Sequence, residues 1–565
     1  MTITPPAAGP MIGGHILVDA LVANGVDTAF CVPGESYLPV LDGLYAHRAK
    51  IALYVCRHEG GAAFMAEAYG KLTGRPGIAL VTRGPGACNA SIGVHSAAQD
   101  SSPMILLVGQ VGSDCADREA FQEIDVRAVF GPIAKWAAQI DRADRIGEYI
   151  NRAFQTAQSG RPGPVVLGLP EDVLFGRAVA KDIRRATNVQ ASASNGDIAR
   201  LATILGSAKR PLVIVGGSGW NDQACRDLRD FAERNRLPVA CAFRFQDLFD
   251  NRHPNYAGDV GLGINPKLAT RIREADVLLV IGARLGEATT SGYTLLDVPA
   301  PRQRLIHVHA GNDELGKVYQ AELQINAGMP EFAQALRGVT LAPEAWHDAS
   351  EQAHRDYLSH ATPSEIGGSL QMRDVVRHLQ DRLPADAIIT NGAGNYAIWM
   401  NRYFGYRQFR TQLAPTSGAM GYGVPAAIAA KIVHRGRIVV SWNGDGCFMM
   451  NGQELATAMR YGLAIVFVVV NNGMFGTIRM HQEMHYPGRV HGTGLHNPDF
   501  CALAQSYGAH GERVLHGAEF PAAFERALAA GRPALIELVV DPEAITPTQT
   551  IAGLRAAAQG LHETI

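Results

Sequence analysis

The sequence has few cysteines and little net charge. Its eight cysteines form no Cys-x-x-Cys pair and no zinc-like spacing. A formal net charge of −2 offers no basic field to nucleic acid or to an anionic membrane. No apolar run approaches the roughly 20 residues that cross a bilayer, and residues 1–11 lack the basic and apolar regions of a signal peptide. We therefore expect reduced thiols, a cytoplasmic location, and small-molecule chemistry with no nucleic-acid or membrane partner.

What the sequence does have is length and a repeated strand pattern. A chain of 565 residues exceeds what one core accommodates. Short apolar runs that end in glycine-rich turns and precede amphipathic stretches are typical of parallel sheets with helical crossovers. The expected fold class is α/β, with three doubly wound parallel-sheet domains. We place them at residues 12–175, 195–340 and 366–545, with linkers at 176–194 and 344–367 and a C-terminal tail or lid at 546–565.

The sharpest motif is Gly-Asp-Gly at 444–446, after an expected strand at 438–441, with Asn-Asn at 471–472 after an expected strand at 465–470. Carboxyl ends of parallel strands meet at one edge of a sheet, so a carboxylate and an amide oxygen there can share a cation. Oxygen ligands suit magnesium. Gly446 would let the backbone approach phosphates, at the start of a loop that leads into a helix over 453–461. Taken alone, such tripeptides are mostly turns and strand-end caps; the spacing and flanking strands favour the cation site.

These motifs resemble the thiamine diphosphate motif of the family that includes acetolactate synthase, pyruvate decarboxylase and benzoylformate decarboxylase. By this resemblance, magnesium on the diphosphate is held by Asp445, the Asn472 side chain and the Met474 carbonyl. Cys447 stands where acetolactate synthases usually carry serine, which weakens one phosphate contact. Met420, by itself a core residue, would support the bent cofactor. The resemblance implies ten cofactor-binding residues: Gly394, Asn395, Tyr396, Gly418, Met420, Asp445, Gly446, Cys447, Asn472 and Met474.

A second signal is Glu59, between an expected strand at 51–55 and a helix of small residues. A carboxylate there can simply favour the start of a helix. Thiamine chemistry, however, requires a protonated N1' on the aminopyrimidine, and a glutamate in a dry pocket can share that proton. The resemblance gives Glu59 this role at the cofactor of a partner subunit, which implies a homodimer or homotetramer.

Departures from the acetolactate synthase pattern concern the reaction. Ala288 stands where an arginine would hold the acceptor carboxylate, and His481 aligns with an expected tryptophan. Glu35 replaces a glycine and resembles the acidic proton donor of pyruvate decarboxylases, although a solvated turn acid is the alternative. Gln122, a candidate catalytic residue together with Glu59, Glu35 and His481, lies in a segment similar to the first domain of acetolactate synthases. With His485 one turn away, His481 is interpreted as substrate-side lining or lid rather than a zinc ligand.

The glycine turn at 216–219 resembles the dinucleotide turn of the middle domain, and Arg284 matches a residue that touches FAD in acetolactate synthases. Glycine turns after strands are common, so FAD is allowed but not expected.

The predicted function is thiamine-diphosphate-dependent decarboxylation, carboligation or both, on a 2-oxo acid such as pyruvate. The alternatives are a carbon–carbon lyase of 2-hydroxyacyl-CoA type and a catalytically silent cofactor-binding protein.

Overall fold

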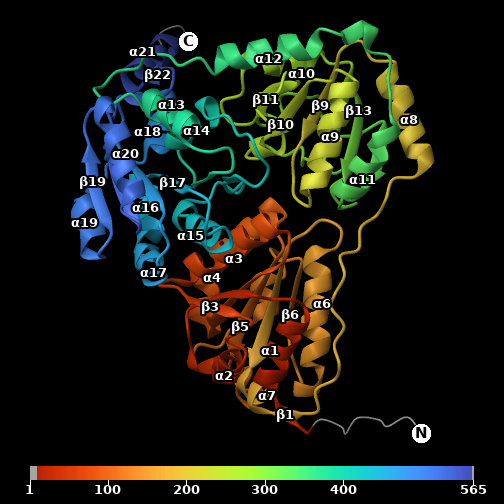
Figure 1. Cartoon of the computed structure of the whole chain (residues 1–565), viewed down its shortest axis with the longest axis vertical. Coiled ribbons are helices and arrows are strands. Elements are labelled where there is room, and N and C mark those ends of the chain that lie inside the picture. The colour runs from red at the N-terminus through yellow and green to blue at the C-terminus, as the bar shows by residue number, and fades with distance from the viewer. Residues whose placement is uncertain (1–8, 563–565) are drawn as a thin grey trace. The chain divides into compact units, whose positions relative to one another are not determined.

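The computed structural model describes residues 9–562 and divides into two compact units, Met1–Val189 and Gln190–Ile565 (Figure 1). The division falls inside the expected linker at 176–194, most of which has neither helix nor strand. No helix within residues 9–562 is long and apolar enough to cross a membrane.

Unit 1 is built on one parallel sheet, whose strand order is β3-β2-β4-β5-β7-β6 over the described residues. Its strands are β2 (Thr28–Cys31), β3 (Ala52–Val55), β4 (Gly77–Thr82), β5 (Met104–Gln110), β6 (Trp136–Gln139) and β7 (Pro164–Pro170). Every residue of β5 and β7 is buried. This explains why these strands read as continuous apolar runs rather than alternating ones.

Helices cover both faces of the unit 1 sheet. One layer shares a core with the strands and consists of α1 (Gly13–Ala23), α2 (Leu38–Ala46) and α6 (Ile146–Gln158). The other contains α3 (Glu59–Thr73) and α4 (Arg83–Asp100), which pack against each other. Shorter elements complete the unit: β1 (Met11–Ile12) paired with β8 (Arg177–Ala178), α5 (Val126–Phe130) and α7 (Glu171–Phe175).

Unit 2 contains two further parallel sheets, of which the first has the order β11-β10-β9-β12-β13-β14. Its strands are β9 (Pro211–Val215), β10 (Val239–Ala242), β11 (Tyr256–Val260), β12 (Val277–Ile281), β13 (Arg304–His309) and β14 (Leu323–Asn326). One face shares a core with α8 (Asn195–Gly206), α9 (Asp222–Arg234) and α11 (Met329–Ala335). The other packs on α10 (Pro266–Glu274) and α12 (Ala349–His360).

The linker expected at 344–367 is wrong in its middle part, because α12 lies there and belongs to the fold. Ala353 of α12 is buried in the core. The Tyr357 ring also meets the Tyr256 ring edge-on at 4.8 Å between centroids. The polar residues that indicated a linker lie on the solvent face of an amphipathic helix.

The second sheet of unit 2 has the order β16-β15-β17-β18-β20-β19. Its strands are β15 (Ile388–Asn391), β16 (Gln412–Leu413), β17 (Val439–Gly444), β18 (Val466–Asn471), β19 (His510–Val514) and β20 (Ala534–Val539). One face shares a core with α13 (Met372–Arg382), α14 (Tyr396–Tyr403) and α20 (Phe520–Ala529). Four more helices pack around this sheet: α15 (Gly423–Val433), α16 (Asp445–Asn451), α17 (Leu455–Arg460) and α19 (Phe500–Ser506).

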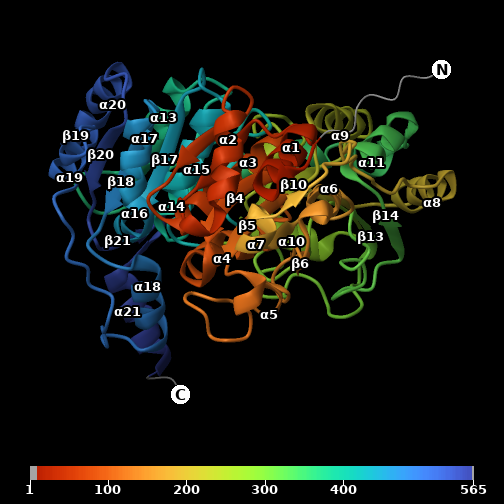
Figure 2. The same ribbon diagram turned by 90° about the horizontal axis from the view of Figure 1, so that it is seen from below.

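The chain beyond this sheet forms a small hairpin and a helix: β21 (Ala544–Thr546), β22 (Gln549–Thr550) and α21 (Ile551–His562). Helix α21 packs against α18 (Gly476–His485), and the two lie side by side in Figure 2. The tail therefore contributes to the packing around the sheet's carboxyl edge.

Strand order separates the three sheets into two kinds. Numbered along the chain, the unit 1 sheet and the last sheet both run 2-1-3-4-6-5, whereas the middle sheet runs 3-2-1-4-5-6. In a doubly wound sheet, ligands bind beyond the carboxyl ends of the strands where the order reverses. Those points lie at β2/β4, β9/β12 and β15/β17. The α/β fold class with three doubly wound parallel sheets is confirmed.

Candidate active site

The Gly-Asp-Gly motif lies at the β15/β17 switch point. Gly444 ends β17 and Asp445 begins α16 directly, so the expected loop after Gly446 is wrong. A 3-10 turn at Gly452–Glu454 separates α16 from α17, and α17 lies inside the helix expected over 453–461. An acidic first residue suits a helix start. A Cβ on Gly446 would lie 2.8 Å from the Phe475 ring, so only glycine fits without displacement.

The Asp445 carboxylate is buried and accepts three hydrogen bonds from neutral donors. Oδ1 accepts from Gly446 N–H at 2.9 Å, and Oδ2 accepts from Gly473 N–H at 2.9 Å and from Asn497 Nδ2 at 2.8 Å. Burial raises the pKa of this carboxyl, although the three donors oppose that shift. Across residues 9–562, no cationic side chain forms an ion pair with Asp445. A buried carboxylate without a counter-charge fits a bound cation.

Asn472 follows the end of β18 and faces the same edge. Its Oδ1 accepts from Met474 N–H at 3.1 Å, so the amide and the Met474 backbone form one tight turn. Gly473 between them has φ 67°, a left-handed conformation that favours glycine. The three residues predicted to hold the cation thus occupy two neighbouring strand ends.

One cavity of about 230 Å³ is lined by all ten residues predicted to bind the cofactor. Its glycine-rich lining leaves backbone groups accessible to a ligand. The sequence reasoning missed most of the apolar wall: Ile366, Leu370, Met372, Trp399, Val470, Phe475, Val540, Ala544 and Ile545. No local motif marks these residues, because distant segments form the wall.

Asn395 ties the cavity to the tail of the chain. Its N–H donates to Thr477 Oγ1 at 3.0 Å, and the Thr477 hydroxyl donates to Asn395 Oδ1 at 2.9 Å. The Asn395 amide nitrogen donates to the Ile545 carbonyl at 3.1 Å. Asn395 is therefore fixed from both α18 and β21.

Tyr396 and Cys447 form a buried pair at the base of the cavity. The Tyr396 hydroxyl donates to Cys447 Sγ at 3.1 Å and accepts from Gly392 N–H at 3.1 Å. Gly421 N–H also donates to Cys447 Sγ at 3.1 Å. Burial raises the pKa of both side chains, which stay protonated at neutral pH. Cys447, at the position where acetolactate synthases usually carry serine, is thus held in place by hydrogen bonds from Tyr396 and Gly421.

In unit 1, Glu59 is the first residue of α3. His58 caps this helix, because its Nδ1 accepts from Gly60 N–H at 3.0 Å. Glu59 Oε2 accepts from Asn89 Nδ2 on α4 at 2.9 Å. A Cβ on Gly86 would lie 3.5 Å from Glu59 Oε1. The carboxylate is half-buried, with one oxygen oriented by a neutral donor.

Glu35 and Arg83 lie at the β2/β4 switch point, where the sequence reasoning had identified only Glu35. The Glu35 side chain is 62% exposed, and its Oε1 lies 3.7 Å from Arg83 Nη1. Arg83 pairs with Glu171 at 2.5 Å and has φ 43°, a left-handed conformation that costs about 1 to 2 kcal/mol outside glycine. Gln122 also has a positive φ, 65°, and its carbonyl accepts from Gly84 N–H at 2.8 Å.

His481 and His485 are exposed on α18, with their rings stacked at 6.3 Å. His481 is not among the residues that line the cavity. Glu483 between them is buried and pairs with Arg479 at 2.6 Å and Arg555 at 2.7 Å. The hydrogen bonds from Arg555 are the largest cause that lowers the Glu483 pKa, to about 2. Glu483 therefore holds α21 against α18.

The glycine turn of the middle sheet lies at the β9/β12 switch point. A Cβ on Gly217 would lie 2.0 Å from the Gly282 carbonyl oxygen, so the two backbones approach closely. The Gly216 carbonyl accepts from Trp220 Nε1 at 2.9 Å, and Arg284 pairs with Glu314 at 3.3 Å. FAD at this turn therefore remains allowed but not expected.

Three family models match the chain in order. The N-terminal TPP binding domain of thiamine pyrophosphate enzymes matches residues 11–129, their central domain residues 198–336, and their C-terminal TPP binding domain residues 392–538. Together with the relatives below, these matches mean that the chain belongs to the thiamine pyrophosphate enzyme family.

Among similar proteins, the chain is 30% identical over 537 residues to the acetolactate synthase isozyme 2 large subunit of Escherichia coli, covering 94% of this chain and 96% of that protein. It is 32% identical to the acetolactate synthase large subunit of Corynebacterium glutamicum, covering 94% and 87%. It is 31% identical to the probable acetolactate synthase large subunit of Methanocaldococcus jannaschii, covering 95% and 93%. The similarity thus extends over nearly the whole chain.

Proposed function

We propose that this thiamine-diphosphate-dependent enzyme decarboxylates a 2-oxo acid such as pyruvate and releases an aldehyde, or transfers the remaining fragment to a second carbonyl compound. Bound thiamine diphosphate supplies a thiazolium carbon that adds to the substrate carbonyl and accepts the electrons left by carbon dioxide. The observation that carries the proposal is the buried Asp445 carboxylate without a cationic partner among the described side chains, beside Asn472 in a glycine-lined cavity. Relatives called acetolactate synthases support the substrate class.

In this proposal, Asp445, the Asn472 side chain and the Met474 carbonyl hold magnesium against the diphosphate. The diphosphate and aminopyrimidine are proposed to contact Gly394, Asn395, Gly418, Gly446 and Cys447. Met420 is proposed to support the bent cofactor, and Tyr396 fixes Cys447 through its hydroxyl group. Oxygen ligands and a buried anionic site suit magnesium.

Glu59 is proposed to keep N1' of the aminopyrimidine protonated. Asn89 donates to one carboxylate oxygen, which leaves the other for that proton. As in the family resemblance, we propose that Glu59 acts on the cofactor of a partner subunit, so that a homodimer is the smallest active form. The proposed dimer is tested by measuring the molecular mass and the specific activity of the protein over a series of dilutions. A fully active monomer contradicts the proposal.

Glu35 is proposed to deliver a proton that ends the reaction at the aldehyde stage. The Glu35 side chain is 62% exposed, so water can reach the carboxyl group, and Arg83 Nη1 lies 3.7 Å from Oε1. Gln122 and His481 are proposed only as residues near the substrate path.

The test is a screen of 2-oxo acids for carbon dioxide release, with products identified, in the presence and absence of thiamine diphosphate and magnesium. Cofactor binding is measured in parallel by calorimetric titration of the wild type and the Asp445→Ala variant. We expect magnesium-dependent binding that the variant loses. Tight binding without a divalent cation contradicts the proposed site, and no turnover of any 2-oxo acid contradicts the proposed reaction.

A further inference from the structure

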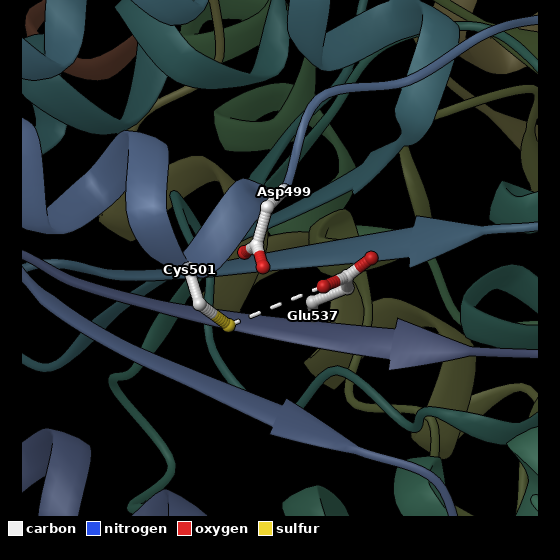
Figure 3. Close-up of side chains that lie close together, drawn as sticks. All are labelled: Asp499, Cys501 and Glu537. Carbon is white, nitrogen blue, oxygen red and sulfur yellow. Dashed lines mark hydrogen bonds between the residues drawn. The ribbon is translucent and has the colours of Figure 1, made fainter.

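Three side chains with metal-ligating atoms, Asp499, Cys501 and Glu537, lie together outside the cavity (Figure 3). Arg513 supplies the positive charge of this cluster, pairing with Glu537 at 2.7 Å and with Asp499 at 3.1 Å. Burial raises the pKa of the Cys501 thiol to about 11, and this thiol lies 4.0 Å from Glu537 Oε2 as a weak donor. Arg513 and the two carboxylates therefore form an ion-pair network beside the Cys501 thiol.

The buried member of this network, Glu537, reaches the candidate active site through Asn471. Strand β20, which carries Glu537, pairs with β18, which ends at Asn471. Glu537 Oε2 accepts from Arg513, and Oε1 accepts from Asn471 Nδ2 at 2.7 Å. A carboxylate paired with arginine only accepts hydrogen bonds, so it selects the amide nitrogen of Asn471. The amide oxygen, Oδ1, must then face the other way.

Asn471 Oδ1 and Asp445 Oδ2 share the same two donors. Gly473 N–H lies 3.1 Å from Asn471 Oδ1 and 2.9 Å from Asp445 Oδ2. Asn497 Nδ2 lies 3.0 Å and 2.8 Å from the same two oxygens. A reversed Asn471 amide would point an NH₂ group at both donors and break the arrangement. The orientation of Asn471 therefore decides whether the donors that hold Asp445 stay in place.

We infer that Glu537 and Asn497 are positioning residues for the cation site, acting through Asn471 and Gly473 on Asp445. Glu537 fixes the Asn471 amide, and Asn497 with Gly473 occupies Asp445 Oδ2. The Asp445 carboxylate is thereby held in one orientation before a cation arrives. This inference rests on the proposed function, in which Asp445 binds magnesium.

The first test is Glu537→Gln in the full-length protein. A glutamine offers one acceptor oxygen to two donors, so either Arg513 or Asn471 loses its bond. We expect the magnesium concentration for half-maximal thiamine diphosphate binding, measured by calorimetry, to rise about 10- to 100-fold. The matched control is Glu512→Gln on neighbouring β19. Glu512 accepts from Arg526 and His510, so the same loss of charge should leave the magnesium requirement within about twofold of the wild type.

A second substitution that restores the hydrogen bonds distinguishes a positioning role of Glu537 from a general loss of stability. In the double variant Glu537→Gln/Asn471→Asp, the new glutamine can accept from Arg513 and donate to the new aspartate, which still accepts from Gly473 and Asn497. We expect the magnesium requirement to return to within about fivefold of the wild type. A purely structural defect would lower the melting temperature without this reciprocal recovery.

A folded Glu537→Gln variant with an unchanged magnesium requirement overturns the inference. If that variant does not fold, Asn497→Ala takes its place, because it removes the other shared donor. An unchanged magnesium requirement in Asn497→Ala then overturns the inference equally. Wild-type binding that needs no divalent cation contradicts the proposed function itself, so the two failures are distinguishable.

Discussion

The unit 1 sheet and the last sheet of unit 2 have the same strand order but carry different chemistry at their switch points. At β15/β17, the buried Asp445 is held by three donors and belongs to a network that extends to Arg513. At β2/β4, Glu35 is mostly exposed, and its one ion pair among the described side chains is a 3.7 Å contact with Arg83. A group that binds a cofactor needs fixed geometry, whereas a group that moves protons needs access to solvent. In the proposed function, one topology thus serves both tasks, and side-chain burial distinguishes them.

Glu59→Gln tests the proton-transfer role proposed for the unit 1 sheet and has the largest expected effect. The amide keeps the shape and the Asn89 contact but cannot share a proton with N1', so turnover should fall about 10²- to 10⁴-fold while cofactor binding persists. Steady-state rates and proton exchange at the thiazolium carbon measure the two parts. Glu148→Gln, an exposed glutamate on α6 that pairs with Arg145, is the control. Near-normal turnover in Glu59→Gln would place activation elsewhere.

Glu35→Gln and Glu35→Gly test whether the exposed carboxylate moves protons at all. If Glu35 delivers the final proton, both variants should slow aldehyde release and shift the aldehyde-to-ligation product ratio about tenfold or more. Product analysis with pyruvate measures the ratio. The Glu35→Gly variant also makes the turn around residue 35 more flexible. The Glu35→Gln variant is therefore measured beside it, because it removes the carboxylate without this change in the backbone. If both variants keep the wild-type ratio and decarboxylation rate, Glu35 is only a turn residue.

Low pH should weaken the packing of α21 against α18 beside the unit 2 cavity, while amide exchange in the unit 1 sheet should not change. The folded-state pKa of Glu483, about 2, is below its ordinary value of 4.5. Its stabilising contribution is therefore present above about pH 4.5 and is lost as the pH falls toward 2. Amide exchange of α21, corrected for intrinsic rates, should rise over that window, with unit 1 peptides as internal reference. Glu483→Gln should remove this pH dependence; an identical profile in that variant would assign it to another group.

Cys447→Ser should have the smallest effect. A serine hydroxyl can accept the same bonds from Tyr396 and Gly421, so thiamine diphosphate affinity should change by no more than about fivefold, the size of one neutral hydrogen bond. Calorimetry measures the affinity. Cys241→Ser, buried in the middle sheet, controls for the loss of a buried thiol. A larger change would indicate that the sulfur itself contacts the ligand.

The sequence was sufficient for the fold class because strands buried on both faces leave continuous apolar runs such as β5. The motifs at adjacent strand ends indicated the cation site, and the family resemblance named the ten residues that line one cavity; their binding of the cofactor stays a prediction. The sequence was insufficient for Arg83, Asn497 and Glu537, whose importance depends on hydrogen bonds between segments far apart in the chain. The helical start at Asp445 and helix α12 were also mispredicted, since glycine and polar residues read locally as loops. Contacts across the fold, rather than local pattern, decide such positions.

The left-handed backbone at Arg83 has a consequence for the charge beside Glu35. A glycine would adopt φ 43° without the steric cost that arginine incurs. Arg83→Gly would relieve this strain, but it would also remove the cation that pairs with Glu171 and lies beside Glu35. The strained backbone is thus retained together with a positive charge beside Glu35, as expected where a local energetic cost accompanies a proposed functional group.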